Sequence, residues 1–473
     1  MGYISKHLQT LMDDGDGQDS LRVVVKLKNP AEPGIHTLEA SEMLGLEALR
    51  SAGLSANTLS LSTIMRVSPS GQSVGLRTTL ADVPGLAAGD GVDYVRPMRI
   101  HRCHLNESIP LIGVSASTPF SGAGIRVAIV DSGIDHNHPD LIGRVNLGLS
   151  RNFTREGDGA GDVMDRNGHG THVAGIVGGA GARFRGVAPG VEFIACKVFD
   201  ATGRAEEAAI SQAVRWAVQN HADVINYSGG FSPLNSRGFP LIPPPWVWSA
   251  ELMEEEKEFL AAMTAGVVCA VSAGNDGRMH SRGTLSMPAI CPDVISVGSV
   301  SKALRLSGFS STGPAFRSAQ VLLANNPQTL TQDLIAQTTA FPEVDLVAPG
   351  GEIDGTASCF FLPGIASALA SAVPGPNDCA VEVNYQRMSG TSQAAPHVAG
   401  LSALVLAACK AKGINPGTRR AFVVKNILRK AATPIQGAVS RDSQGAGVPS
   451  WPRIEKLLND IAAGHLPIAA FEV

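Results

Sequence analysis

IRVAIVDSGID, residues 125–135, is a β-branched apolar run that ends in an acidic residue and a glycine turn. Apolar runs of this length are typical of strands that are buried on both faces of a parallel sheet. Residues 205–221 and 249–265 carry apolar side chains at helical spacing. The alternation predicts an α/β fold, a doubly wound and mostly parallel sheet with helices on both faces. The other strand-like runs are VEFIACKV (191–198), DVINYS (223–228), VVCAVS (267–272) and VISVGS (294–299).

The first hundred residues have a different order of predicted strands and helices. This order predicts a small α+β domain of the ferredoxin-like type over residues 20–103, after a flexible acidic leader at 1–19. The larger domain then spans 104–465 and leaves a tail at 466–473. In the small domain we expect strands at 21–29, 59–67 and 92–100, and helices at 36–51 and 81–87.

Three segments interrupt the larger domain as predicted loop insertions, near 232–248, 314–340 and 351–387. The last insertion contains Cys359 and Cys379, the two of the seven cysteines that are best placed to pair. The first twenty residues lack the apolar core of an export signal, which favours a cytoplasmic location and reduced thiols. We therefore expect no disulfide framework.

Composition argues against two classes of partner. The formal net charge is −4 and no run of Lys or Arg is long enough to follow a phosphate backbone, so we expect no nucleic acid. The apolar stretch at 359–373 contains Pro363 and Gly364 and is shorter than the roughly 20 residues that cross a bilayer. We also expect no membrane anchor.

Two segments supply a carboxylate and an imidazole. Asp131 ends the apolar run in VAIVDSGIDHNHPDL (127–141), where a buried carboxylate would hold an imidazole in one tautomer. His169 lies in NGHGTHVAG (167–175), whose small residues let a helix begin next to the ring. His172 follows one helical turn later and raises the alternative of a metal site, but no Asp or Glu stands at the spacing of a zinc-binding helix.

Two further segments supply a hydroxyl and an amide. Ser392 in SGTSQAAPHVAGLSALVL (389–406) is predicted at a helix N-terminus, which favours developing negative charge. Asn275 in VVCAVSAGND (267–276) follows a strand and would donate to an oxyanion. Each segment alone also fits an ordinary turn or helix cap. Acyl transfer by serine needs all of these groups together.

The four segments, in the chain order Asp, His, Asn and Ser, resemble the subtilase family of serine proteases over about residues 104–458. The resemblance implies a serine endopeptidase that acts on a protein or peptide substrate. It implies a catalytic triad of Asp131, His169 and Ser392, with Asn275 in the oxyanion hole. It also implies a pocket for an apolar side chain, since the walls and floor carry no carboxylate. These pocket residues are Ser228, Gly229, Gly230, Ser272, Ala273, Gly274 and Ser286.

The sequence departs from the family pattern at two places, the residue after the nucleophile and the loop that often binds calcium. Gln393 follows the nucleophile where the family usually has Met. The segment IVGGAGARFRGVAP (176–189) is shorter and less polar than the loop that holds a structural calcium in many members, so we expect no cofactor. A hard cation at the acidic stretch that follows Asn152 remains the alternative to a solvated loop. Its carboxylates are Glu156, Asp158, Asp162 and Asp165.

The small N-terminal domain resembles the subtilase propeptide. The resemblance implies an autoprocessed or self-inhibited zymogen in which this domain is the intramolecular inhibitor, with a junction near 102–106. One alternative is a permanent domain that binds something else. Another is a partner-regulated or non-catalytic binding protein with the subtilase fold.

Overall fold

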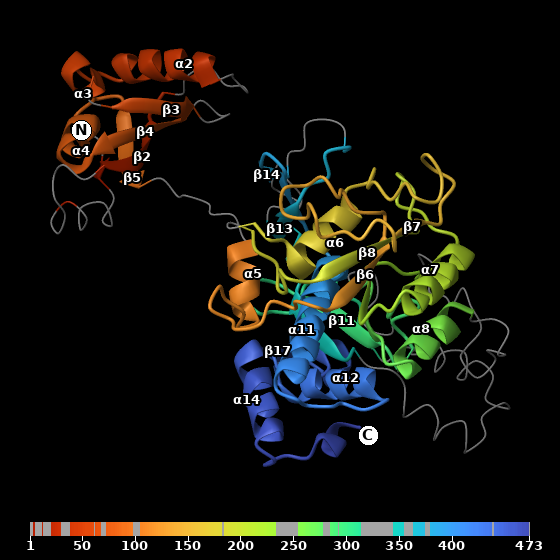
Figure 1. The fold of residues 1–473 in the computed structure, drawn as a ribbon. Helices are drawn as coiled ribbons and strands as arrows, with labels where there is room; N and C mark the ends of the chain where they lie inside the picture. The colour runs from red at the N-terminus through yellow and green to blue at the C-terminus, as the bar shows by residue number, and fades with distance from the viewer. Residues whose placement is uncertain are drawn as a thin grey trace, which may run out of the picture. The chain divides into compact units, whose positions relative to one another are not determined.

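The computed structural model divides the chain into two compact units, residues 1–102 and residues 103–473 (Figure 1). We call them the N-terminal unit and the C-terminal unit and describe each by itself. The structure describes residues 3–4, 12, 20–29, 38–60, 62–67, 72–97, 105–181, 184–232, 254–277, 284–291, 293–313, 344–353, 363–373, 379–437 and 439–472.

The N-terminal unit is a five-stranded sheet with the strand order β1-β5-β2-β4-β3. Its strands are β1 (Tyr3–Ile4), β2 (Ser20–Leu27), β3 (Thr63–Val67), β4 (Ser73–Thr79) and β5 (Val92–Pro97). Only the pairing of β1 with β5 is parallel among the described pairs. Its helices are α2 (Leu38–Ser51), α3 (Ala56–Ser60) and α4 (Val83–Ala87).

This unit has its own apolar core, which includes Val23, Val25, Leu76, Leu86 and Val95. The sequence patterns did not predict β4, since its glycine and polar residues break the apolar run. The strand predicted at 59–67 begins only at Thr63, because α3 takes the residues up to Ser60.

The C-terminal unit is built on a seven-stranded sheet with the order β12-β11-β10-β9-β6-β8-β7, and every pairing in it is parallel. After β6 the chain forms β7 and β8 on one side of β6, and it then crosses to form β9 on the other side. The strand order therefore switches direction between β6 and β9. Open α/β sheets bind ligands in the crevice beyond the carboxyl ends of strands at such a switch. The strands are β6 (Arg126–Asp131), β7 (Arg151–Asn152), β8 (Glu192–Lys197), β9 (Val224–Tyr227), β10 (Val268–Ser272), β11 (Ile295–Val300) and β12 (Leu346–Pro349).

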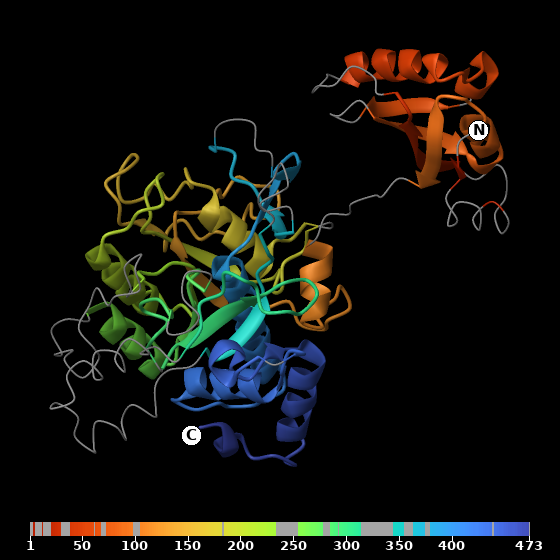
Figure 2. The same ribbon diagram turned by 180° about the vertical axis from the view of Figure 1, so that it is seen from behind.

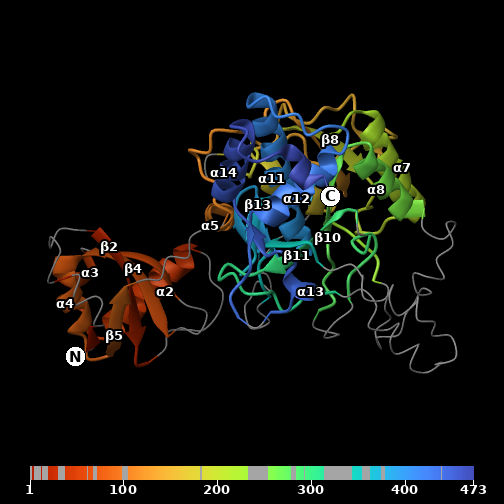
Figure 3. The same cartoon turned by 90° about the horizontal axis from the view of Figure 1, so that it is seen from below.

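Helices cover this sheet as the sequence predicts. Helices α7 (Glu207–Gln219) and α8 (Glu254–Thr264) lie side by side (Figures 1 and 2). Figure 3 shows this pair apart from α11 (Thr391–Ala411) and α14 (Trp451–Ala462). The remaining long helices are α5 (Leu105–Leu111), α6 (His169–Gly178) and α12 (Arg420–Lys430).

Helix α11 packs along β9, β10 and β11 and against α6. It is long and apolar enough to cross a membrane, but 83% of its most apolar window is buried inside the protein. Packing in the core therefore accounts for its apolar character.

The structure corrects three expectations about the C-terminal unit. The insertion predicted at 351–387 contains a small antiparallel sheet of β13 (Ile365–Ala368), β14 (Ala380–Glu382) and β15 (Tyr385–Met388). The predicted tail is packed, since Phe471 is 1% exposed and its carbonyl accepts a hydrogen bond from Asn426.

Cysteine pairing is the third correction. Cys379 is disulfide-bonded, so the expectation of reduced thiols is wrong at this residue, and its partner lies outside the described residues. Four other cysteines are free and buried, namely Cys196, Cys269, Cys291 and Cys409.

Two of the predicted insertions lie almost entirely outside the residues that the structure describes. They are the insertion at 314–340 and all but the first residue of that at 232–248.

Candidate active site

The predicted site residues meet at the carboxyl ends of the central strands. Asp131 is the last residue of β6, Ser228 follows β9, and Asn275 lies three residues after β10. Because β6, β9 and β10 are parallel neighbours in the sheet, these ends share one edge. The site therefore lies at the switch in strand order, where this fold forms its crevice.

Asp131 and His169 form a hydrogen-bonded pair. The His169 Nδ1–H donates to Asp131 Oδ1 at 2.8 Å, and the Ser132 N–H donates to the same oxygen at 2.7 Å. Asp131 is fully buried, whereas the His169 side chain is 25% exposed. Burial lowers the pKa of His169, but the nearby carboxylates of Asp131 and Asp165 outweigh it, and the net effect raises the pKa.

Helix α6 begins at His169, and its first N–H groups all have acceptors. The His169 N–H donates to Asn167 Oδ1 at 3.3 Å, and the Gly170 N–H donates to Ser132 Oγ at 2.9 Å. The Thr171 N–H donates to the Asp165 carboxylate at 2.8 Å. Gly168 precedes the helix with φ 95°, a conformation that favours glycine. The NGHGTH sequence therefore fixes where the imidazole stands.

His172 is buried and hydrogen-bonded to the backbone of β13. Its Nε2 lies 3.0 Å from the Ile365 carbonyl oxygen, and burial lowers its pKa to about 3. The His169 Nδ1 is already bound to Asp131. Within the described ranges no three His, Cys, Asp or Glu side chains are grouped to hold a metal ion.

Ser392 occupies the second position of α11, against the backbone that follows β9. Its hydroxyl donates to the Ser228 carbonyl oxygen at 3.0 Å, and the Ser228 hydroxyl donates to the Ser392 carbonyl oxygen at 2.9 Å. The reciprocal pair holds the start of α11 at the same strand end as His169.

Asn275 and the Ser392 N–H converge on the space beside Gly390. The Asn275 Oδ1 accepts a hydrogen bond from the Thr391 N–H at 2.9 Å, which turns the Nδ2 group toward Gly390. A Cβ atom on Gly390 would lie 3.0 Å from Gln393 Oε1, 3.4 Å from Asn275 Nδ2 and 3.6 Å from Ser392 N. Asn275 Nδ2 and Ser392 N therefore lie on the same side of Gly390, as two donors to one oxyanion would, beside the side-chain oxygen of Gln393.

The pocket next to His169 has a volume of about 240 Å³. It adds four residues that the sequence reasoning missed, namely Ser132, Asn167, Phe199 and Gly203. Phe199 was predictable in principle, since it lies two residues beyond the carboxyl end of β8. A side chain at residue 229 would collide with the Phe199 ring, so the ring can occupy this position only because residue 229 is a glycine.

Residues from both predicted walls and from the predicted floor of the pocket contact one another. The Ser286 hydroxyl donates to the Ser272 carbonyl oxygen at 3.4 Å, and the Ser286 N–H donates to the Ala273 carbonyl oxygen at 2.9 Å. The Ser272 hydroxyl donates to the Gly229 carbonyl oxygen at 3.2 Å. A Cβ on Gly230 would lie 2.6 Å from Ser286 Oγ. The structure therefore brings the two walls and the floor together.

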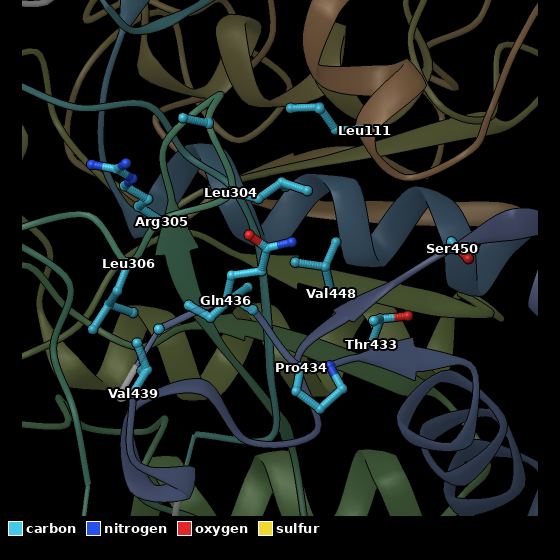
Figure 4. A pocket seen from close by; sticks show the side chains of 13 residues that line it. Leu111, Leu304, Arg305, Leu306, Thr433, Pro434, Gln436, Val439, Val448 and Ser450 are labelled. Carbon is cyan, nitrogen blue, oxygen red and sulfur yellow. The ribbon is translucent and has the colours of Figure 1, made fainter.

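A larger cavity of about 890 Å³ lies elsewhere in the C-terminal unit (Figure 4). Its lining includes Leu304, Leu306 and Val448 with the polar Arg305 and Gln436, and it shares no residue with the pocket beside His169. The described residues of its lining include no His, Asp, Glu or Cys, so they offer no acid or base for catalysis. The candidate site is therefore the smaller pocket beside His169.

Known proteins with similar sequences are proteases. The profile of the subtilase family, Peptidase_S8, matches residues 122–447. Subtilisin of Bacillus pumilus is 31% identical over 292 residues, which cover 61% of this chain and 79% of that protein. Subtilisin E of Bacillus subtilis is 30% identical, and the match covers 57% of its length. An intracellular serine protease of Paenibacillus polymyxa is 33% identical over 60% of this chain and 67% of its own.

Two solved structures share the fold. A cold-adapted subtilisin-like serine proteinase matches 74% of this chain and 99% of its own with a TM-score of 0.51 and 23% identity. A lanthipeptide protease matches 75% of this chain and 95% of its own with a TM-score of 0.54 and 23% identity. The chain therefore belongs to the subtilase family of subtilisin-like serine endopeptidases.

Proposed function

We propose that the chain hydrolyses peptide bonds through an acyl-enzyme on Ser392, with His169 as general base and Asp131 as the group that orients it. The observation that carries the proposal is the Asp131–His169 hydrogen bond at the end of β6, beside the end of the neighbouring strand β9, where Ser228 holds Ser392. Asn275 and the Ser392 N–H, which lie on the same side of Gly390, are the proposed oxyanion donors.

The reaction begins when the Ser392 hydroxyl leaves the Ser228 carbonyl oxygen and turns toward His169 Nε2. Its oxygen attacks the scissile carbonyl carbon while Nε2 takes the proton, and Asp131 stabilises the imidazolium through Nδ1–H. The tetrahedral oxyanion accepts hydrogen bonds from the two donors beside Gly390. His169 then gives the proton to the leaving amine, and water repeats the sequence to release the acid.

The substrate preference follows from the walls of the pocket. Gly229, Gly230 and Ser286 offer small neutral surfaces, and the Phe199 ring adds an aromatic wall beside His169. We propose a protein or peptide substrate with an apolar side chain before the cleaved bond. Glycines at 229 and 230 leave their backbone open to pair with an extended substrate.

We also propose that residues 1–102 inhibit the enzyme as an intramolecular propeptide until the chain cuts itself. The support is a compact unit with its own core and sheet, together with its resemblance to the family propeptide. A permanent binding domain is the competing function for this unit.

Calcium is a cofactor that the family implies, and the residues here do not fit it. Residues 180 and 181 lie against Asp140, and the Ala180 N–H donates to the Asp140 carbonyl oxygen at 3.0 Å. A Cβ on Gly181 would lie 2.5 Å from both carboxylate oxygens of Asp140. The Tyr385 hydroxyl donates to the same oxygens at 3.0 Å, and the Phe184 ring packs on Tyr385. Calcium needs six to eight oxygen ligands, so we propose that the fold is stable without it.

The cellular compartment is a separate proposal. Similarity to intracellular serine proteases of Paenibacillus polymyxa and Bacillus subtilis supports a cytoplasmic location. The disulfide at Cys379 is instead typical of an oxidising compartment. Alkylation of Cys379 in protein taken directly from cells would support the cytoplasmic location, and a protected Cys379 would contradict it.

The proposed activity is tested with a fluorophosphonate probe and a peptide substrate. We expect the wild-type protein to be labelled on Ser392 and to release the amine product. Ser392→Ala should fold, resist labelling and lose activity, because the oxyanion hole alone leaves only a residual rate. Undiminished turnover by Ser392→Ala would remove the triad assignment.

A further inference from the structure

We propose that Asp165 is a positioning residue for the proteolytic reaction, because its carboxylate ties the strand end that carries Asp131 to the helix start that carries His169. The inference rests on the proposed function. Sequence patterns grouped Asp165 with three carboxylates of an acidic loop, but the structure buries it completely. A buried carboxylate is costly unless hydrogen-bond donors or an opposite charge stabilise it.

Five donors surround the Asp165 carboxylate. Its Oδ1 accepts hydrogen bonds from the Ser132 hydroxyl at 2.9 Å and from the N–H groups of Asn167 and Gly168 at 3.0 and 2.8 Å. Its Oδ2 accepts from the Thr171 N–H at 2.8 Å and the Thr171 hydroxyl at 2.7 Å. Every contact is a donor, so the site is built for a carboxylate and not for an amide or a carboxylic acid.

These contacts connect both partners of the catalytic pair. Ser132 is the residue after Asp131, and its own N–H donates to Asp131 Oδ1. The Ser132 hydroxyl also accepts the Gly170 N–H, directly after His169. Asp165 therefore fixes Ser132 on the Asp131 side and Thr171 on the His169 side through one carboxylate. A displacement of about 1 Å between reacting groups is enough to cost a factor of about 10² in rate.

Charge gives Asp165 a second effect on His169. Among the described residues, the titratable groups that interact with the imidazole are Asp131 from β6, Asp165 from the preceding loop and His172 from α6, while Lys197 from β8 interacts with Asp165. Both carboxylates raise the pKa of His169, and buried His172 is neutral. Burial raises the pKa of Asp165 and its hydrogen bonds lower it, and the net effect is a raised pKa. Loss of the Asp165 charge should therefore lower the pKa of His169.

The test uses three variants of the full chain, with kcat and KM measured against pH. Asp165→Asn keeps the volume but removes the charge and one acceptor. Ser132→Ala removes the link to β6 and leaves the Asp165 charge. Asp162→Asn is the matched control, because Asp162 lies in the same loop and pairs with Arg166 at 2.8 Å.

We expect Asp165→Asn to lower kcat about ten- to a hundredfold at little change in KM, and to move the acidic limb of its kcat/KM profile to lower pH, since that limb follows the free His169. Ser132→Ala should lower kcat and leave the limb in place. Asp162→Asn should change neither quantity.

An Asp165→Asn profile that coincides with that of Asp162→Asn would overturn the proposal. If Asp165→Asn does not fold, an unchanged kcat in Ser132→Ala would overturn it instead. Wild-type protein that neither reacts with fluorophosphonate nor cleaves peptides would reject the proposed function, which is a distinct result.

Discussion

In the proposed oxyanion site, Asn275 Nδ2 is the donor that a side chain supplies. The amide is held by the hydrogen bond from the Thr391 N–H to its oxygen, so the donor is already oriented before substrate arrives. A preoriented donor contributes more to the transition state than to substrate binding, because charge develops on the carbonyl oxygen only during attack.

We predict that Asn275→Leu lowers kcat by about 10²–10³ with little change in KM, since leucine fills the same space without a donor. The measurement is steady-state kinetics on one peptide substrate, with the melting temperature as the check on folding. An unchanged kcat would mean that other groups hold the oxyanion.

Single residues also show what a sequence conveys and what it does not. Asp131, His169, Asn275 and Ser392 were predicted from the chain order of their four segments and the resemblance to subtilases, since each segment alone also fits an ordinary turn or helix cap. The role of Asp165 was not, since a charge pattern does not report burial or the positions of five donors. Burial comes from the packing of α6 against β6, which local sequence does not encode.

The approach of α6 to β6 is the contact between elements on which the site depends. Gly170 lies so close to the end of β6 that a Cβ atom there would collide with the Gly133 carbonyl oxygen. The same atom would lie 3.2 Å from Asp131 Oδ1. Glycine at this position lets the helix bring His169 within hydrogen-bond distance of Asp131.

We predict that Gly170→Ala lowers both the melting temperature and kcat, because α6 must move away from β6 to make room. Gly161→Ala is the control, since a Cβ on Gly161 would meet no atom within 4 Å and no unusual φ constrains it. Thermal unfolding and kinetics of the two variants give the comparison. Equal behaviour of the two alanine variants would show that the close approach is not required.

At the level of elements, long periodic segments were predicted well and short ones were not. The five predicted strands of the large sheet and helices α7 and α8 agree with the structure to within a few residues, apart from the start of α8, where residues 249–253 are outside the described part. β13, β14 and β15 were missed, since strands of three or four residues are set by their antiparallel partners and not by their own periodicity.

The stability of the whole C-terminal unit should not depend on calcium, because the Asp140 carboxylate already accepts a hydrogen bond from the Tyr385 hydroxyl. We predict that the melting temperature of wild-type protein is the same in EDTA and in calcium. Tyr385→Phe should lower it, since loss of a hydrogen bond to a buried carboxylate costs about 1.5–3 kcal/mol. A large fall in EDTA that calcium reverses would contradict the prediction.

Whether the chain is a zymogen depends on whether the N-terminal unit is cut from the C-terminal unit. The predicted junction at residues 102–106 includes the start of α5, and α5 is firmly packed in the C-terminal unit. Ile109 is 7% exposed, and the buried Ser108 hydroxyl lies 3.0 Å from Nε2 of His397 on α11. A cut just before residue 105 would therefore leave the C-terminal unit whole and its nucleophile helix undisturbed.

We predict that expressed wild-type protein splits near this junction, whereas Ser392→Ala stays full length, because the enzyme's own nucleophile makes the cut. Mass spectrometry of the intact protein and of the new N-terminus gives the position. The released fragment should inhibit the mature enzyme when added back, as expected of an intramolecular inhibitor. Wild-type protein that stays uncut, is fully active and is indifferent to deletion of residues 1–100 would instead identify the N-terminal unit as a permanent domain with another partner.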